Sequence, residues 1–179
     1  AEHRIKLLKA KLSSLAAEQD VEKSEQSKSE IVSSFILPIK TEPRSSLNAY
    51  FGKGRQDSKG RVLPRPWYEV ELIVSKSVTT QADYPKRDEV ITVVTDDGWK
   101  FDCHCTGDYA KNFRSFGNLE ILGKWLKGRL EESGALKPGS PVTLEVLEKY
   151  GNDKIVLSKH KDGLWSLNFE QKGKNYESL

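Results

Sequence analysis

The stretch 99–106 alternates strictly between apolar and polar side chains, and this pattern constrains the fold more than any other feature of the chain. The apolar positions are Trp99, Phe101, Cys103 and Cys105, and the polar ones are Lys100, Asp102, His104 and Thr106. A second strand-like stretch, 89–95, precedes it across Asp96-Asp97-Gly98, and Asp and Gly tolerate the positive φ of a tight turn. The pattern predicts a β-hairpin with one buried face and one face in water.

The chain from residue 31 onward shows further strand patterns and two helix patterns. Apolar and alternating runs predict strands at 33–39, 67–75, 154–159 and 164–169. Apolar stripes predict helices at 119–130 and 144–150, for which Asn118 and Thr143 are suitable N-caps. We therefore expect a mainly β fold with two helices, arranged as a partly closed barrel of about seven strands, because closure removes exposed strand edges.

The first 30 residues differ in composition from the rest. Ile5, Leu8, Leu12 and Leu15 recur at helical spacing and predict an N-terminal helix. Residues 18–30 are almost wholly charged or polar and predict a solvated linker. We interpret 1–30 as a helix and charged linker from a preceding domain, with a dimerising coiled coil as the alternative. We expect residues 31–170 to form the barrel and 171–179 to form a frayed tail. We interpret the lack of Met as the sign of a piece of a longer protein.

The distribution of charge is more informative than its sum. The net charge is only +3, from 29 Lys and Arg against 26 Asp and Glu. Between residues 40 and 65, however, only Glu42 and Asp57 oppose a set of basic residues. These are Lys40, Arg44, Lys53, Arg55, Lys59, Arg61 and Arg65. This local excess of positive charge favours a nucleic-acid partner.

Two polar segments punctuated by glycine, 53–61 and 107–115, each lie between strand-like stretches, and we call them the first and second arms. Their side chains match base edges and phosphate oxygens. The candidate DNA-binding residues are Lys53, Arg55, Gln56, Asp57, Ser58, Lys59 and Arg61 in the first arm, and Tyr109, Lys111, Asn112, Arg114 and Ser115 in the second. We predict that the two arms grip duplex DNA. The alternative is that both are ordinary solvated loops.

Some roles within the arms stay open at this stage. Gln56, Asp57 and Ser58 either read bases or set the shape of the first arm. The Asp57 carboxylate in particular either accepts from a cytosine amino group or orients an arginine. Tyr50 and Phe51 are expected to anchor the first arm to the barrel.

The two cysteines and the lack of targeting signals indicate the cellular compartment. Cys103 and Cys105 lie on one face of a strand, where a bridge between them would distort the backbone, so we interpret them as core residues. There is no signal peptide, apolar run of membrane length or disulfide framework. These features favour a reducing cytoplasm and no membrane partner, and no cofactor or metal is expected.

The order and spacing of several short motifs carry a resemblance to a known family. The motifs are Ser46-Leu47-Asn48, Gly54-Arg55 and Arg61, Val94-Thr95-Asp96-Asp97-Gly98 with Phe101 and Cys103, Gly107 with Lys111-Asn112, Leu122-Gly123 with Arg129-Leu130, Leu147-Glu148-Lys149-Tyr150-Gly151, and Trp165-Ser166-Leu167-Asn168-Phe169. Across roughly residues 31–170 the chain resembles the C-terminal DNA-binding domain of the NgoFVII family of type II restriction endonucleases.

The resemblance implies a pseudobarrel like that of the plant B-three transcription factors, as also found in the BfiI endonuclease. It further implies that two arms reach into the major groove, and they fall on 53–61 and 107–115. Full-length bacterial members carry an N-terminal phospholipase D-like nuclease domain. Its signature, a His and a Lys two apart with an Asp further on, does not occur here, since His160-Lys161-Asp162 has the wrong spacing. This chain is therefore expected to bind DNA without cutting it.

Two other classes of function stay in view. A metal-dependent nuclease would use Asp96, Asp97 and Asp102 as Mg²⁺ ligands. The tight turn explains the first two residues better, and the third lies on the wet face of the next strand. A protein-interaction barrel would leave both arms as ordinary loops and would show no salt-dependent affinity for DNA.

Overall fold

The computed structural model describes residues 20–171, and the predicted N-terminal helix and nearly all of the predicted tail lie outside this range. The strands are β1 (Glu22–Lys23), β2 (Ile31–Pro38), β3 (Arg55–Gln56), β4 (Val62–Leu63), β5 (Leu72–Ile73), β6 (Ile91–Thr95), β7 (Trp99–Thr106), β8 (Asn112–Ser115), β9 (Lys154–His160) and β10 (Trp165–Asn168). The helices are α2 (Lys76–Thr79), α3 (Glu120–Glu132) and α4 (Leu144–Tyr150), with short 3-10 helices η1 (Ser46–Phe51) and η2 (Asp108–Ala110).

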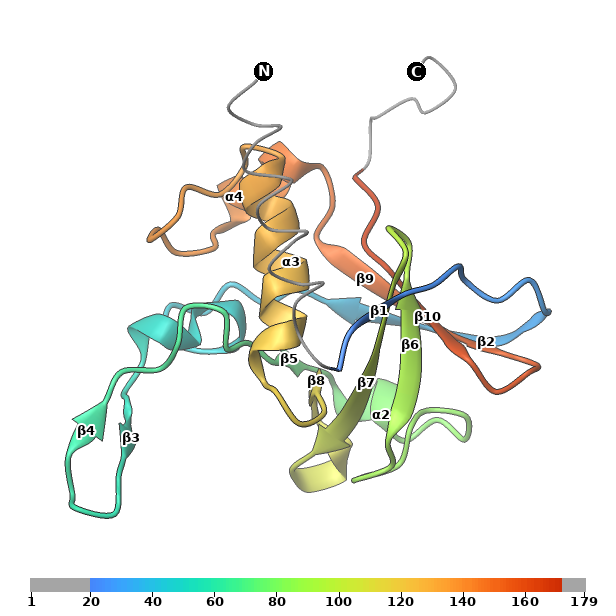
Figure 1. Cartoon of the computed structure of the whole chain (residues 1–179), viewed down its shortest axis with the longest axis horizontal. Coiled ribbons are helices and arrows are strands. Elements are labelled where there is room, and N and C mark those ends of the chain that lie inside the picture. The colour runs from blue at the N-terminus through green and yellow to red at the C-terminus, as the bar shows by residue number, and fades with distance from the viewer. Residues whose placement is uncertain (1–19, 172–179) are drawn as a thin grey trace.

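The main sheet is a curled half-barrel, which confirms the predicted pseudobarrel class. Its strand order is β2-β9-β10-β6-β7-β8-β5, and β1 pairs with β7 off this path. All neighbours are antiparallel except β10 and β6, which are parallel. In Figure 1 the sheet curls around the core and α3 lies across one side of it. The strands β3 and β4 form a separate two-stranded sheet.

The predicted β6–β7 hairpin and both predicted helices are present. Val93 lies opposite Phe101, and the four apolar positions of β7 are buried while the four polar ones are half-buried. The Asn118 side chain accepts from the Glu120 N–H at 2.9 Å near the start of α3. The Thr143 side chain accepts from the Val146 N–H at the start of α4. The helices α2, η1 and η2 are additional to the prediction.

The strand predicted over 67–75 is much shorter. Only Leu72–Ile73 pairs with a neighbour, β8. The Glu69 N–H instead donates to the Pro66 carbonyl at 3.2 Å, which bends the chain away from the sheet. The alternation extends beyond the paired residues, because Val70 and Val74 are buried as well as Leu72.

Residues 20–30, the described part of the predicted linker 18–30, contact the barrel at several points. Val21 is buried, and β1 pairs with the start of β7. The Gln26 amide donates to the Val94 carbonyl at 3.0 Å and to Asn168 Oδ1 at 2.6 Å. Backbone pairing and amide hydrogen bonds do not need apolar side chains, so the polar composition did not reveal this docking.

We expect the buried thiol of Cys105 to contribute a loss of stability at alkaline pH. Burial raises the pKa of Cys105 to about 11 from an ordinary 9.0. Below pH 9 both states hold the proton; above it the unfolded chain releases the proton first. The free energy of unfolding should therefore fall by about 2 kcal/mol between about pH 9 and pH 11 from this group. Urea unfolding across this range measures it, and a decline as steep in Cys105→Ala would contradict the assignment.

Within residues 20–171, no helix has both the length and the apolar character that crossing a bilayer requires.

Candidate nucleic-acid interface

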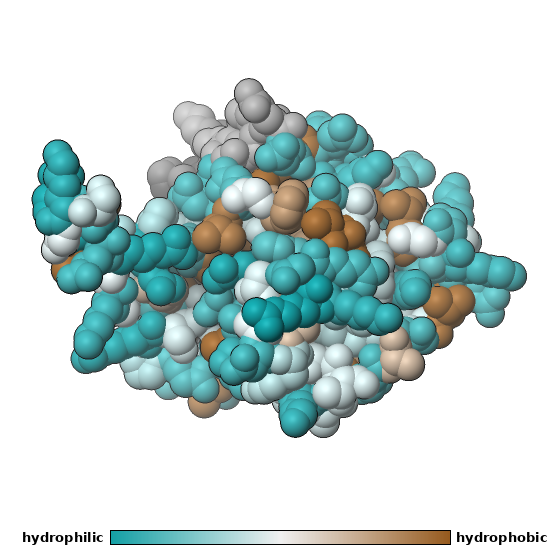
Figure 2. All heavy atoms as spheres, turned by 90° about the horizontal axis from the view of Figure 1, so that it is seen from below, coloured by the Kyte–Doolittle hydropathy of each residue, from teal (hydrophilic) through white to brown (hydrophobic). Residues whose placement is uncertain are grey.

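The first arm, extended by residues 62–63, is the β3–β4 hairpin, and it stands clear of the barrel. Arg55 lies opposite Leu63, and Gln56 lies opposite Val62. In Figure 1 the hairpin reaches outward to the lower left, and in Figure 2 it projects at the left edge with a largely hydrophilic surface. Lys53, Arg55, Gln56, Ser58, Lys59 and Arg61 are all exposed. The arm is therefore a two-stranded ribbon with basic side chains open to a partner.

Asp57 organises the turn at the tip of the hairpin. Its Oδ1 accepts from the N–H groups of Lys59 at 2.9 Å and Arg61 at 2.8 Å, and its Oδ2 accepts from the Arg61 guanidinium at 2.7 Å. The hydrogen bond from the Arg61 N–H is the main cause that lowers the pKa of Asp57. Gly60 has a φ of +77°, which glycine adopts without strain. Of the two roles considered for Asp57, this geometry displays the orienting one.

An aromatic cluster forms the base of the hairpin. Tyr50 and Phe51, from η1, pack edge-on against Trp67 with ring centroids 5.2 and 6.0 Å away. The Lys127 ammonium, from α3, lies 3.3 Å from the centroid of the Trp67 ring and donates to the Trp67 carbonyl at 2.7 Å. Burial lowers the pKa of Lys127 to about 8. The hairpin is thus attached to the barrel next to Tyr50 and Phe51, the residues expected from the sequence to anchor it, and α3 supports this attachment.

Glycine at the hairpin stem is dictated by the close approach of the two strands. A Cβ on Gly54 would lie 2.0 Å from the Leu63 carbonyl oxygen, far inside van der Waals contact. No side chain fits there unless β4 moves away, so Gly54 permits the narrow ribbon that carries Arg55 and Gln56.

The second arm does not project as the first one does. Its residues 112–115 form β8, inside the main sheet between β7 and β5. Ser115 is fully buried: its hydroxyl donates to the Asn118 carbonyl at 2.8 Å and accepts from the Leu122 N–H at 3.3 Å. Ser115 therefore supports the start of α3. Asn112 and Arg114 are half-buried.

The exposed part of the second arm is the η2 turn. Tyr109 and Ala110 have φ values of +45° and +57°, and such left-handed conformations cost a non-glycine residue roughly 1–3 kcal/mol. The turn presents Tyr109, which is 46% exposed, next to the half-buried Lys111. In Figure 1, η2 and the tip of the β3–β4 hairpin both lie along the lower side of the molecule in this view.

Two ion pairs join the arms to one intervening segment. The Arg55 guanidinium of the first arm pairs with Glu69, and the Arg114 guanidinium of the second arm donates to Glu71 at 2.6 Å. The sequence reasoning did not single out either glutamate as a site residue. A signal was present, however, because Glu69 and Glu71 share one face of the alternating stretch 67–75.

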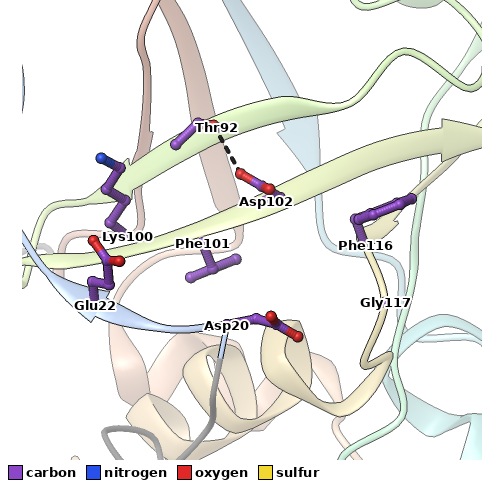
Figure 3. A pocket seen from close by; sticks show the side chains of 8 residues that line it. All are labelled: Asp20, Glu22, Thr92, Lys100, Phe101, Asp102, Phe116 and Gly117. Atoms are coloured by element: carbon purple, nitrogen blue, oxygen red, sulfur yellow. Dashed lines mark hydrogen bonds between the residues drawn. The ribbon is translucent and has the colours of Figure 1, made fainter.

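The three aspartates considered as metal ligands take structural roles. Asp96 pairs with the Arg129 guanidinium, and Asp97 accepts from the Trp125 indole at 2.8 Å. Asp102 accepts from the Thr92 hydroxyl at 2.8 Å (Figure 3). Across residues 20–171, no group of three or more His, Cys, Asp or Glu side chains is placed to hold a metal ion.

Asp102 also lines a hollow of about 400 Å³ with Asp20 and Glu22 (Figure 3). Thr92, Lys100, Phe101, Phe116 and Gly117 also line it. Three carboxylates against one ammonium make this hollow a poor surface for phosphates, so the DNA-facing candidate remains the side that carries the arms.

A curled half-barrel with a protruding basic ribbon defines a barrel-type nucleic-acid-binding domain. Comparison with protein families gives the particular kind: residues 24–161 match the NgoFVII C-terminal B3-like DNA-binding domain. The match covers most of the chain, which belongs to this family and is a B3-like DNA-binding domain of a restriction-enzyme family. No curated protein matches the chain.

Proposed function

We propose that this domain recognises a short specific sequence in duplex DNA by placing its two arms in the major groove. The observation that carries the proposal is the β3–β4 hairpin with its exposed Lys53, Arg55, Lys59 and Arg61. The major groove of B-DNA is about 12 Å wide and admits a two-stranded ribbon of this kind. The η2 turn of the second arm, which exposes Tyr109, is the second point of contact.

The side chains of the hairpin divide into two kinds of contact. Arg55 and Arg61 are held by carboxylates and have the forked donors that match guanine O6 and N7. Lys53 and Lys59 are exposed point charges that suit phosphates. Gln56 is the candidate for adenine, and Tyr109, Lys111, Asn112 and Arg114 are the candidates from the second arm. Ser58 at the tip is the remaining candidate, whereas Asp57 and Ser115 act through the fold.

In a restriction endonuclease, such a domain supplies recognition and another domain supplies cleavage. The resemblance to the NgoFVII family makes a phospholipase D-like nuclease domain the proposed N-terminal partner, working in a bacterial cytoplasm. The chain described here then binds without cutting.

Selection from randomised duplexes tests the proposal, followed by a salt series on the enriched sequence. Enrichment of one short motif, with affinity falling steeply as salt rises, is the expected result. Binding without enrichment would reduce the domain to a non-specific anchor. No binding to any duplex would favour the alternative that the domain is a protein-interaction barrel. Cleavage on addition of Mg²⁺ would favour the alternative that it is a metal-dependent nuclease.

Replacement of Lys53 or Lys59 by alanine should weaken all duplexes alike. Each lost phosphate contact reduces the slope of log affinity against log salt by about 0.9. Fluorescence anisotropy at several salt concentrations, on the enriched and a scrambled duplex, measures both slopes. Lys149→Ala, on α4 at the other end of the barrel, is the matched control and should leave both slopes unchanged. A loss confined to the enriched duplex would identify base readout instead.

A further inference from the structure

One short segment of the barrel holds an arginine of each arm. Glu69 and Glu71 lie two residues apart on the run that leads into β5, and they pair with Arg55 and Arg114 respectively. The two arms are far apart in the sequence and belong to different sheets. Their arginines are nevertheless fixed from a common base.

The two partners of the first pair differ sharply in exposure. The Glu69 side chain is 9% exposed, whereas the Arg55 side chain is 54% exposed. The carboxylate therefore belongs to the barrel interior, and the guanidinium reaches from the hairpin toward solvent. In the second pair the exposures are 20% for Glu71 and 23% for Arg114, so both side chains of that pair are mostly covered.

A single N–H of each guanidinium is used in these pairs, the one on Nη2. An arginine has five N–H donors in a rigid fork, so the remaining donors of Arg55 are open to a second acceptor. A carboxylate on one side of the fork fixes the direction in which the other side points. This is the arrangement needed to present a planar donor pair to a base edge.

We propose that Glu69 and Glu71 are positioning residues that set the sequence specificity of this domain by holding Arg55 and Arg114 for base readout. The inference rests on the proposed DNA recognition and adds to it two acidic residues that do not themselves contact DNA. Without the pairs, each arginine becomes a mobile cation that binds any phosphate within reach.

Two physical effects distinguish a positioning role from a purely structural one in the measured affinities. Ordering a free arginine on binding costs conformational entropy, and the carboxylate removes this cost only for the geometry it enforces. The same carboxylate repels phosphates and lowers affinity for random DNA. Neutralising it should therefore weaken the enriched duplex and strengthen random duplexes. A purely structural ion pair would instead lower both affinities together, in step with stability.

The test compares Glu69→Gln and Glu71→Gln with the unsubstituted domain on the enriched and scrambled duplexes. We expect the ratio of the two affinities to fall about three- to tenfold for each variant. Glu42→Gln removes one negative charge from the same basic stretch and takes no part in either pair, so it should leave the ratio unchanged. Urea unfolding of every variant reports folding. Glu69→Asp or Glu71→Asp, which keeps the charge but shortens the reach, replaces the glutamine variant at the same position if that variant fails to fold.

A double-mutant cycle shows whether each glutamate acts through its arginine. In an Arg55→Ala background, Glu69→Gln should have no further effect on the ratio, and likewise Glu71→Gln in Arg114→Ala. Additive effects would overturn the inference, as would an unchanged ratio in both glutamate variants. These results differ from failure of the proposed function, in which the unsubstituted domain itself shows no preference for any duplex.

Discussion

Replacing Arg55 and Arg61 together by alanine is expected to reduce affinity for the enriched duplex by about 2–6 kcal/mol, taking about 1–3 kcal/mol for each base-reading arginine. Both side chains are more than half exposed on the hairpin, and each is oriented by a carboxylate, Glu69 or Asp57. Affinity for a scrambled duplex should change only by the loss of two positive charges. Anisotropy titrations on both duplexes give the two values.

The control for this double variant is Lys149→Ala with Lys154→Ala. Both lysines are exposed, and they lie on α4 and at the start of β9, away from the hairpin (Figure 1). The control removes the same number of positive charges from another part of the surface. It therefore separates the effect of where the charges lie from the effect of net charge. Equal losses on the enriched and scrambled duplexes in the arginine variant would remove base readout by the first arm.

The parts of the fold that local chemistry determines were predictable from the sequence. The β6–β7 hairpin follows from strict alternation around an Asp-Gly turn, and α4 follows from a Thr143 cap and a closing Gly151, which has a left-handed φ of +92°. The first arm was predictable for the same reason. Its polar tip is organised by Asp57, four residues before Arg61, so the interactions that shape it are local.

The parts that depend on distant partners were not predictable in this way. Ser115 is indistinguishable in sequence from a surface serine, and only the start of α3 shows that its hydroxyl is buried and used. The docking of residues 20–30 depends on backbone edges of β7 and on Asn168, nearly the whole chain away. The Glu69 and Glu71 pairs likewise require that the arms fold before their partners can be identified.

The second large effect is expected from a substitution in α3, where the helix packs against the segment that attaches the first arm. Gly123 lies near the start of α3, and a Cβ there would be 1.6 Å from the Tyr68 carbonyl oxygen and 2.5 Å from its carbonyl carbon. Both atoms belong to backbone, so no rotamer change relieves the overlap. Alanine in an open helix interior would stabilise by about 1 kcal/mol relative to glycine. We expect Gly123→Ala instead to lower the free energy of unfolding by about 3 kcal/mol or more.

The displaced segment links this substitution to function. Tyr68 stands between Trp67, the aromatic base of the hairpin, and Glu69, the partner of Arg55. A variant that still folds should therefore lose preference for the enriched duplex as well as stability.

Gly139→Ala separates this steric effect from the usual cost of replacing glycine. Gly139 has a φ of +87° and open space around its would-be Cβ, so its replacement should cost only about 1 kcal/mol of conformational strain. Urea unfolding of the two variants, side by side, gives the comparison. If Gly123→Ala cost no more than Gly139→Ala, the helix would have room to move away from Tyr68, and the rigid support inferred for the first arm would be wrong.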